Sequence, residues 1–222
     1  MIKVYHKKIF FCDILKIIER RFTYMNIKYD YNSPVIITYL ILSVIAWLLN
    51  TISRGKTNKA LFSNYRSSPL SPLTYIRLFT HSIGHKDWDH LASNFLYILL
   101  IGPMIEEKYG SINLLIMFLI TSLTIALFNI IFNNYCITGA SGNVYMLIVI
   151  SSFSNLSEGK IPITLILIFL FYISTEIKKS ILEGNKKVYH DGHLIGALCG
   201  LAFGFIFLKN PNLITFIQNI LK

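Results

Sequence analysis

The chain has 222 residues, of which 54% are hydrophobic and only 14% charged, and its mean hydropathy is +0.55. Soluble domains carry roughly 25% charged residues, so this composition excludes an ordinary soluble domain and predicts an integral membrane protein. The 21 Lys and Arg outnumber the 11 Asp and Glu but are scattered over loops and termini, which favours attraction to a lipid bilayer and argues against nucleic-acid binding.

Residues 1–33 form a basic N-terminal segment that is too polar to span a bilayer. Its apolar residues recur at helical spacing among lysines and arginines, a pattern typical of an amphipathic helix at a membrane surface. Charged residues interrupt the apolar run and no small-residue cleavage site follows, so we do not expect a signal peptide. The basic residues favour a cytoplasmic N-terminus.

Six predominantly apolar runs follow, each near the ~20 residues that a helix needs to cross a bilayer core. They predict an all-α polytopic membrane domain over residues 34–209, with both chain ends on one side. The remaining residues, 210–222, are too few to span and are expected to lie along the surface. The predicted spans are residues 34–52, 88–105, 111–133, 141–156, 161–177 and 190–208.

Polar residues inside predicted spans point to function, because a charge at the centre of a spanning helix costs about 2.5–3.5 kcal/mol. The second span begins with His90 and Asn94, which lie one turn apart on one helix face. The fourth begins at Ser141, which helical rise places about a third of the way into the core from the outer face. Non-helical backbone at that depth must be covered by protein or line water, so we expect a hydrated pocket opening outward above Ser141.

The sixth span carries His193, followed by glycines at positions 196, 200 and 204. Glycines at this spacing strip one helix face and let a neighbouring backbone approach closely. If the neighbour is the start of the fourth span, His193 comes within hydrogen-bonding reach of Ser141. A serine hydroxyl needs a base before it can attack a carbonyl, and a neutral imidazole is suited to this near pH 7.

Three patterns on the second, fourth and sixth of these helices resemble the motifs of the rhomboid intramembrane serine proteases. They are His85-x4-His90-x3-Asn94, Gly139-Ala140-Ser141-Gly142 and His193-x2-Gly196-x3-Gly200. The resemblance covers about residues 34–208. It implies a six-helix rhomboid-like bundle that hydrolyses peptide bonds in or near transmembrane helices of membrane-protein substrates. It further implies a Ser141–His193 dyad without an acidic third member, and an oxyanion site formed by His90, Asn94 and the Ser141 N–H.

The same resemblance assigns supporting roles to further residues. Tyr145 matches a tyrosine that packs on the catalytic histidine, and Arg77 matches the arginine of the first-loop motif, where an isoleucine replaces the family's tryptophan. Glu106 matches an acidic residue that holds the first loop, while His81 and His85 match positions expected to be structural. No cofactor and no metal ion are implied.

Asp191 and the cysteines are not expected to take part in chemistry. Asp191 lies two residues before His193 and would face nearly the opposite side of a helix, so we leave it out of a catalytic triad. Cys12, Cys136 and Cys199 lack C-x-x-C spacing, so neither a disulfide framework nor a thiolate metal site is indicated.

Two other functions fit parts of the pattern. A metal-ion transporter could use the His and Asp side chains at 81–90 and 190–193 as ligands, although no H-E-x-x-H motif of a zinc protease occurs. A rhomboid-like protein could instead bind membrane helices without cutting them. Ser141 would be dispensable in both cases. We expect a multi-pass protein of a bacterial cytoplasmic membrane, and the sequence gives no basis for an oligomeric state.

Overall fold

The computed structural model describes residues 31–133, 135–153 and 191–209, with separate positions between 163 and 174. Predictions for the N-terminal segment up to residue 30, for most of span 161–177 and for the tail 210–222 lie outside these residues. The regular elements of the described part are helices, joined by loops, with an isolated antiparallel β-bridge between Asn64 and Ile137. Its elements are α2 (Pro34–Ile52), α3 (Lys56–Leu61), α4 (Pro72–Thr80), α5 (Trp88–Tyr109), α6 (Ser111–Phe128), the π-helical turn η1 (Asn129–Asn133), α7 (Ser141–Ser151) and α9 (Asp191–Lys209).

Three of the described helical segments are long and apolar enough to cross a membrane: α2, α6 continued by η1, and α9. These agree with the first, third and sixth predicted spans to within one residue at each end. The chain is therefore an all-α protein with several membrane-spanning candidates. The count of six spans stays a prediction, because the fifth lies mostly outside the described residues and α5 and α7 do not meet the same criteria.

The second and fourth predicted spans differ from the helices observed. α5 has 22 residues and continues through Pro103 to Tyr109. The predicted span ends at residue 105 because the last turn of the helix is charged. α7 has only 11 residues, so the predicted helix is wrong for residues 152 and 153. There the N–H groups of Ser152 and Phe153 donate to carbonyls three residues back, a tightened turn that ends the helix.

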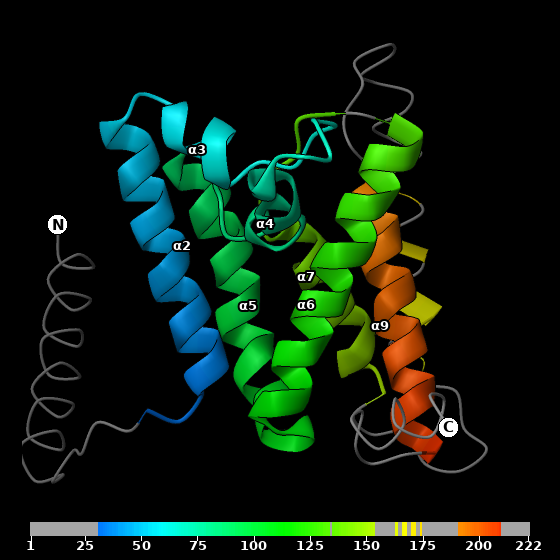
Figure 1. The fold of residues 1–222 in the computed structure, drawn as a ribbon. Coiled ribbons are helices and arrows are strands. Elements are labelled where there is room, and N and C mark those ends of the chain that lie inside the picture. The colour runs from blue at the N-terminus through cyan, green and yellow to red at the C-terminus, as the bar shows by residue number, and fades with distance from the viewer. Residues whose placement is uncertain are drawn as a thin grey trace, which may run out of the picture. The chain divides into compact units, whose positions relative to one another are not determined.

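α7 lies inside the bundle, in contact with α5, α6 and α9 (Figure 1). Met146, Leu147 and Ile150 are almost completely buried, whereas outward-facing Leu100 and Leu115 on neighbouring helices are 64% and 43% exposed. Apolar outer faces match a hydrocarbon surrounding, where lipid covers them. The surrounding helices also explain how irregular backbone just before α7 can lie inside a membrane protein, because protein covers it.

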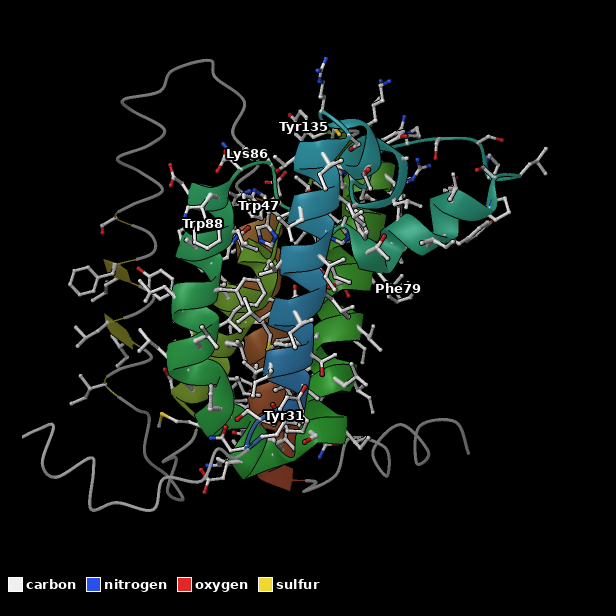
Figure 2. All side chains as sticks on the ribbon, turned by 90° about the vertical axis from the view of Figure 1, so that its left-hand side faces the viewer. Tyr31, Trp47, Phe79, Lys86, Trp88 and Tyr135 are labelled. Carbon is white, nitrogen blue, oxygen red and sulfur yellow. The ribbon has the colours of Figure 1, made fainter. Side chains whose placement is uncertain are left out.

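The first loop, between α2 and α5, contains α3 and α4 and folds around Arg77. The Arg77 side chain is 4% exposed and donates to the Tyr65 hydroxyl and to Ser67 Oγ, both at 2.6 Å, while its guanidinium lies over the Tyr65 ring. The rings of Trp47 on α2 and Trp88 on α5 pack together with their centroids 5.3 Å apart. Phe79 projects outward from α4 (Figure 2). Arg77 thus holds the loop compact.

Glu106 differs from its expected role of holding the first loop. Its carboxylate accepts hydrogen bonds from the backbone N–H groups of Val35 at 2.9 Å and Ile36 at 3.1 Å, at the start of α2. α5 runs antiparallel to α2, so the end of α5 reaches the start of α2 and not the loop that follows it (Figure 1). A carboxylate there satisfies unpaired N–H groups and opposes the positive end of the helix dipole.

Candidate active site

Ser141 and His193 meet where the first turn of α7 lies against the first turn of α9. Nε2 of His193 is 3.0 Å from Oγ of Ser141, a hydrogen-bonding distance across 52 positions of the chain. Ser141 is the first residue of α7, so its backbone N–H is among those without a carbonyl partner inside the helix. The Ser141 hydroxyl, the His193 imidazole and the first backbone N–H groups of α7 thus lie close together.

Glycines on α9 allow this approach. A Cβ built on Gly196 would lie against the backbone of Gly142, 2.8 Å from its carbonyl carbon, and one on Gly200 would lie 2.6 Å from the Met146 carbonyl oxygen. A side chain at either position would force the helices apart. The two backbones therefore touch directly, which brings side chains near the helix starts within reach of each other.

The imidazole of His193 is flanked by Tyr145, which lies one turn below Ser141. The two rings stack with centroids 4.5 Å apart and planes inclined by 24°. Asp191 instead accepts a hydrogen bond on Oδ2 from Nδ2 of Asn133 at 2.7 Å. The ring of His193 is thus held on one face by an aromatic side chain, and Asp191 is engaged with the end of η1.

Gly139 brings His90 and Asn94 to the same place. Its φ of +119° favours glycine, and a Cβ there would lie 2.5 Å from Cε1 of His90 and 3.7 Å from Nδ2 of Asn94. Asn94 is 7% exposed, and its Nδ2 has no hydrogen-bond partner among the described residues. A buried amide donor beside the serine loop is suited to receive a developing negative charge.

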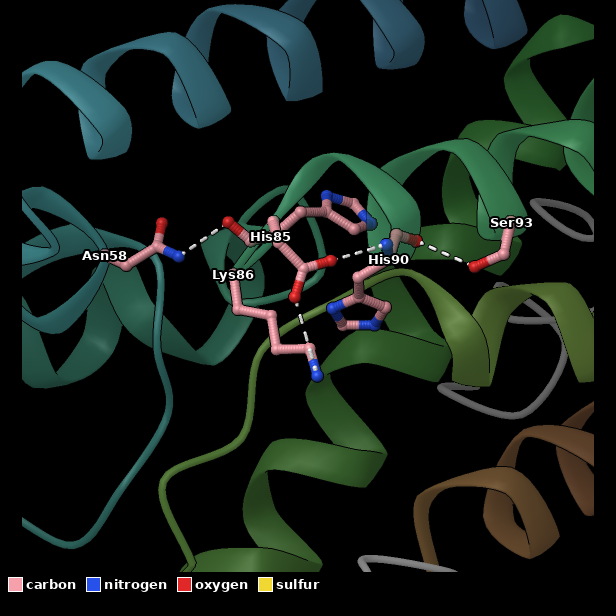
Figure 3. Close-up of polar contacts among 6 residues, drawn as sticks. Asn58, His85, Lys86, His90 and Ser93 are labelled. Carbon is pink, nitrogen blue, oxygen red and sulfur yellow. Dashed lines mark hydrogen bonds and ion pairs between the residues drawn. The ribbon is translucent and has the colours of Figure 1, made fainter.

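His90 is held through its backbone at the start of α5. Its N–H donates to the Asp87 carboxylate at 2.8 Å, which caps the helix, and its carbonyl accepts from the Ser93 hydroxyl at 3.1 Å (Figure 3). The imidazole of His85 packs edge-on against that of His90, with centroids 5.0 Å apart. The His90 ring is therefore oriented by both its helix cap and the first loop.

Residues of the first loop hold the backbone that leads into Ser141. Asn64 exchanges backbone hydrogen bonds with Ile137 at 2.8 and 2.9 Å, and the carbonyl of His81 accepts from the Gly139 N–H at 2.9 Å. The Ala140 N–H points to Nε2 of His85 at 3.4 Å. These contacts hold the irregular segment before α7 against the first loop, in the manner of a short strand pairing.

Both loop histidines are neutral in the folded chain. Burial lowers the pKa of His81 to about 4, and burial together with the nearby His90 lowers the pKa of His85 to about 4. Nδ1 of His85 lies 3.0 Å from the Ile83 carbonyl, which only accepts. Nδ1 therefore carries the proton and Nε2 is left as an acceptor for the Ala140 N–H.

A cavity of about 30 Å³ lies beside Ser141. This volume has room for two or three water molecules, which need roughly 10–15 Å³ each. The predicted hydration of such a pocket stays a prediction. The cavity is lined by residues of the first loop, of α6, of the segment before α7, of α7 itself and of α9: His81, Ser82, Ser122, Ile125, Ile137, Gly139, Ser141, Gly142, Asn143 and Gly192.

Comparison with known protein families gives one clear result. A model of the Rhomboid domain matches residues 72–210, which is more than half of the chain. The chain belongs to the rhomboid family. Its described helices and this membership identify it as an integral membrane protein.

Curated relatives of this rhomboid are similar at low identity. Rhomboid-like protein 11, chloroplastic, from Arabidopsis thaliana is 27% identical over 72% of this chain and 59% of its own length. Rhomboid protease GluP from Bacillus subtilis is 27% identical over 60% of this chain and 27% of its own, and RHOMBOID-like protein 1 from Arabidopsis thaliana is 28% identical over 61% and 35%. The matched region thus spans less than two thirds of these relatives.

The metal-transporter alternative gains no ligand set from the described residues of this rhomboid. No three His, Cys, Asp or Glu side chains in that part of the chain lie close enough together to hold an ion. Asp87 caps α5 and pairs with Lys86 at 3.6 Å, and Asp191 binds Asn133. These acidic groups have structural partners.

Sequence reasoning missed Asn143 and Asn64. Asn143 is 2% exposed and donates from Nδ2 to the Tyr39 hydroxyl at 3.1 Å and to Ser122 Oγ at 3.3 Å, which joins α7 to α2 and α6 beside the cavity. An asparagine on an otherwise apolar helix was the available signal. Asn64 holds Ile137 through its backbone, and a backbone contact leaves no pattern of residue types in the sequence.

Proposed function

We propose that this rhomboid is an intramembrane serine endopeptidase that hydrolyses peptide bonds in or near transmembrane helices of membrane proteins. Ser141 is the nucleophile and His193 its base. The observation that carries the proposal is the 3.0 Å contact between Ser141 Oγ and His193 Nε2, where the Ser141 hydroxyl can donate to a neutral imidazole. A relative named as a rhomboid protease adds support.

The chemistry runs through an acyl-enzyme. Oγ of Ser141 attacks the carbonyl carbon of the scissile bond while Nε2 of His193 takes the hydroxyl proton, and the imidazolium then returns a proton to the leaving amine. Water deprotonated by the same imidazole hydrolyses the ester and regenerates the serine. Stacking of Tyr145 keeps the ring in one plane during both transfers.

The oxyanion is received by Asn94 Nδ2, the His90 ring and the Ser141 N–H. The unpartnered amide of Asn94 and the proximity of both side chains to Gly139 support this assignment. One such donor is worth about 2.7–4 kcal/mol of transition-state stabilisation. Loss of Asn94 should therefore cost activity without abolishing the reaction of Ser141 with an irreversible probe.

The substrate is a single-pass or polytopic membrane protein whose helix unwinds locally at the cut. A helical peptide bond is shielded and its carbonyl already accepts a hydrogen bond, so small or helix-breaking residues are expected around the cleavage point. A cytoplasmic N-terminus completes the proposal and rests on the basic residues of segment 1–33.

The test is co-expression with a tagged single-pass membrane protein. Wild type should release a shorter tagged fragment, whereas Ser141→Ala and His193→Ala should not. Ser151→Ala is the matched control, because Ser151 is also on α7 but its hydroxyl only donates to the Ile148 carbonyl. Cleavage that survives both site substitutions would refute the proposal, and a biological effect that survives Ser141→Ala would favour a rhomboid that binds helices without cutting them.

A further inference from the structure

The contact between the end of η1 and the start of α9 lies next to the candidate base. Asn133 is the last residue of η1 and Asp191 the first residue of α9. The 2.7 Å hydrogen bond from Asn133 Nδ2 to Asp191 Oδ2 joins them across 58 positions. A hydrogen bond to a carboxylate at this distance is of the short, charge-assisted kind. His193 follows Asp191 by two residues.

The η1 end of this contact is itself anchored. Asn129, the first residue of η1, is fully buried and donates from Nδ2 to Asn64 Oδ1 at 3.0 Å and to the Tyr135 carbonyl at 2.8 Å. Arg66 donates from Nε and Nη2 to the Ile130 carbonyl at 2.9 and 2.6 Å. Asn133 therefore projects from a turn that the first loop holds in place.

The α9 end of this contact is the first turn of the helix, which carries His193. Gly196 and Gly200 bring the second and third turns of α9 against α7, and in the first turn the Gly192 carbonyl lies close to Gly142. Helix ends fray because their first N–H groups lack helical partners. A carboxylate in the first turn with a fixed partner opposes fraying and suits the positive end of the helix dipole.

We propose that the Asn133–Asp191 hydrogen bond is a clasp that sets the position of His193 against Ser141, with Asp191 as a positioning residue that does not touch substrate. This inference rests on the proposed protease function. It also gives a role to η1, because π-helical turns are often found at functional sites. Asn133 is the last residue of this turn.

Four variants separate the hydrogen bond from the charge. Asn133→Ala and Asp191→Ala each remove the bond, and kcat for cleavage should fall about tenfold with KM unchanged, because sub-ångström misplacement of a base is costly. Asp191→Asn keeps an acceptor oxygen and should stay within about threefold of wild type. The double variant Asn133→Asp, Asp191→Asn restores the pair with its partners exchanged, and activity should return.

Asn113→Ala is the control, since Asn113 lies at the other end of α6 and donates to the Tyr109 carbonyl at 2.7 Å. It should leave kcat unchanged. If Asn133→Ala cleaves like wild type, or Asp191→Asn is as impaired as Asp191→Ala, the clasp is refuted. Impairment of the exchanged pair to the level of the single alanine variants would refute it equally.

A readout that needs no cleavage keeps the two proposals apart. Amide hydrogen exchange in the first turn of α9 should be faster in Asn133→Ala than in wild type, while exchange near Gly200 should not change. If the wild type shows no Ser141-dependent cleavage, the protease function fails, and the exchange result still decides whether the clasp orders α9. Unchanged exchange in the first turn would overturn the clasp.

Discussion

Gly196 is the position at which a single methyl group should separate the candidate dyad. A Cβ there lies 2.8 Å from the carbonyl carbon and 3.0 Å from Cα of Gly142, and closer still to the carbonyl oxygen. All of these atoms belong to the backbone, so no side-chain rotation can relieve the overlap. α9 must therefore move away from α7 in Gly196→Ala.

The size of that movement follows from contact distances. Ordinary carbon–carbon contacts begin near 3.5 Å, so the helices must separate by about 1 Å to clear both the carbonyl carbon and its oxygen. His193 lies one turn from Gly196 and moves with it, and the 3.0 Å contact with Ser141 would open beyond hydrogen-bonding range. A displacement of this size can lower kcat about 100-fold.

The assay is kcat for cleavage of a single-pass substrate in lipid nanodiscs, with the rate of Ser141 labelling by a fluorophosphonate as a second readout. Overpacking should also lower the unfolding free energy by about 1–3 kcal/mol. Gly204→Ala is the comparison on the same helix, because the atoms nearest its Cβ belong to the Phe153 side chain and not to the backbone of α7. A Gly196→Ala protein that folds and cleaves at the wild-type rate would refute the reasoning, as would equal losses in both variants.

Three further predictions concern other contacts. Gly139→Ala should abolish cleavage because its Cβ displaces His90, whereas Gly110→Ala, with a φ of +83° and open space around its Cβ, should lower only stability in thermal unfolding. Glu106→Ala should lower the unfolding free energy by about 3 kcal/mol in denaturation, with kcat per folded molecule unchanged, because two N–H groups of α2 lose a charged acceptor. Because the pKa of His81 is lowered from 6.5 to about 4 in the folded chain, the unfolded chain alone binds this proton between those values. The melting temperature should then fall as pH decreases from 6.5 to 4, less steeply in His81→Gln.

The spans over 34–52, 111–133 and 190–208 were predictable because the bilayer imposes a local rule. A helix that crosses it must be apolar along its whole length, and hydropathy reads that rule directly. The glycine spacing after His193 was informative for the same reason, since four-residue spacing on a helix has one geometric meaning.

The lengths of α5 and α7 and the partners of Glu106 were not predictable in this way. α5 remains helical through its charged last turn, where Glu106 accepts a hydrogen bond from the Val35 N–H at the start of α2. The two residues are 71 positions apart in the chain. α7 can be short because α5, α6 and α9 surround it. Hydropathy says nothing about which helix ends meet.

In the candidate site, too, some features were predictable from the sequence and others depended on the tertiary structure. The amino-acid sequence by itself determined that Ser141, His193, His90 and Asn94 stand at the starts of apolar helices, because the types and their helical spacing are local properties. Only the tertiary structure decided that the first loop holds the backbone before Ser141 and that Asn133 holds Asp191. Hydrogen bonds between residues 55 to 75 positions apart depend on how helices are ordered in space, and that order arises from the packing of all of them together.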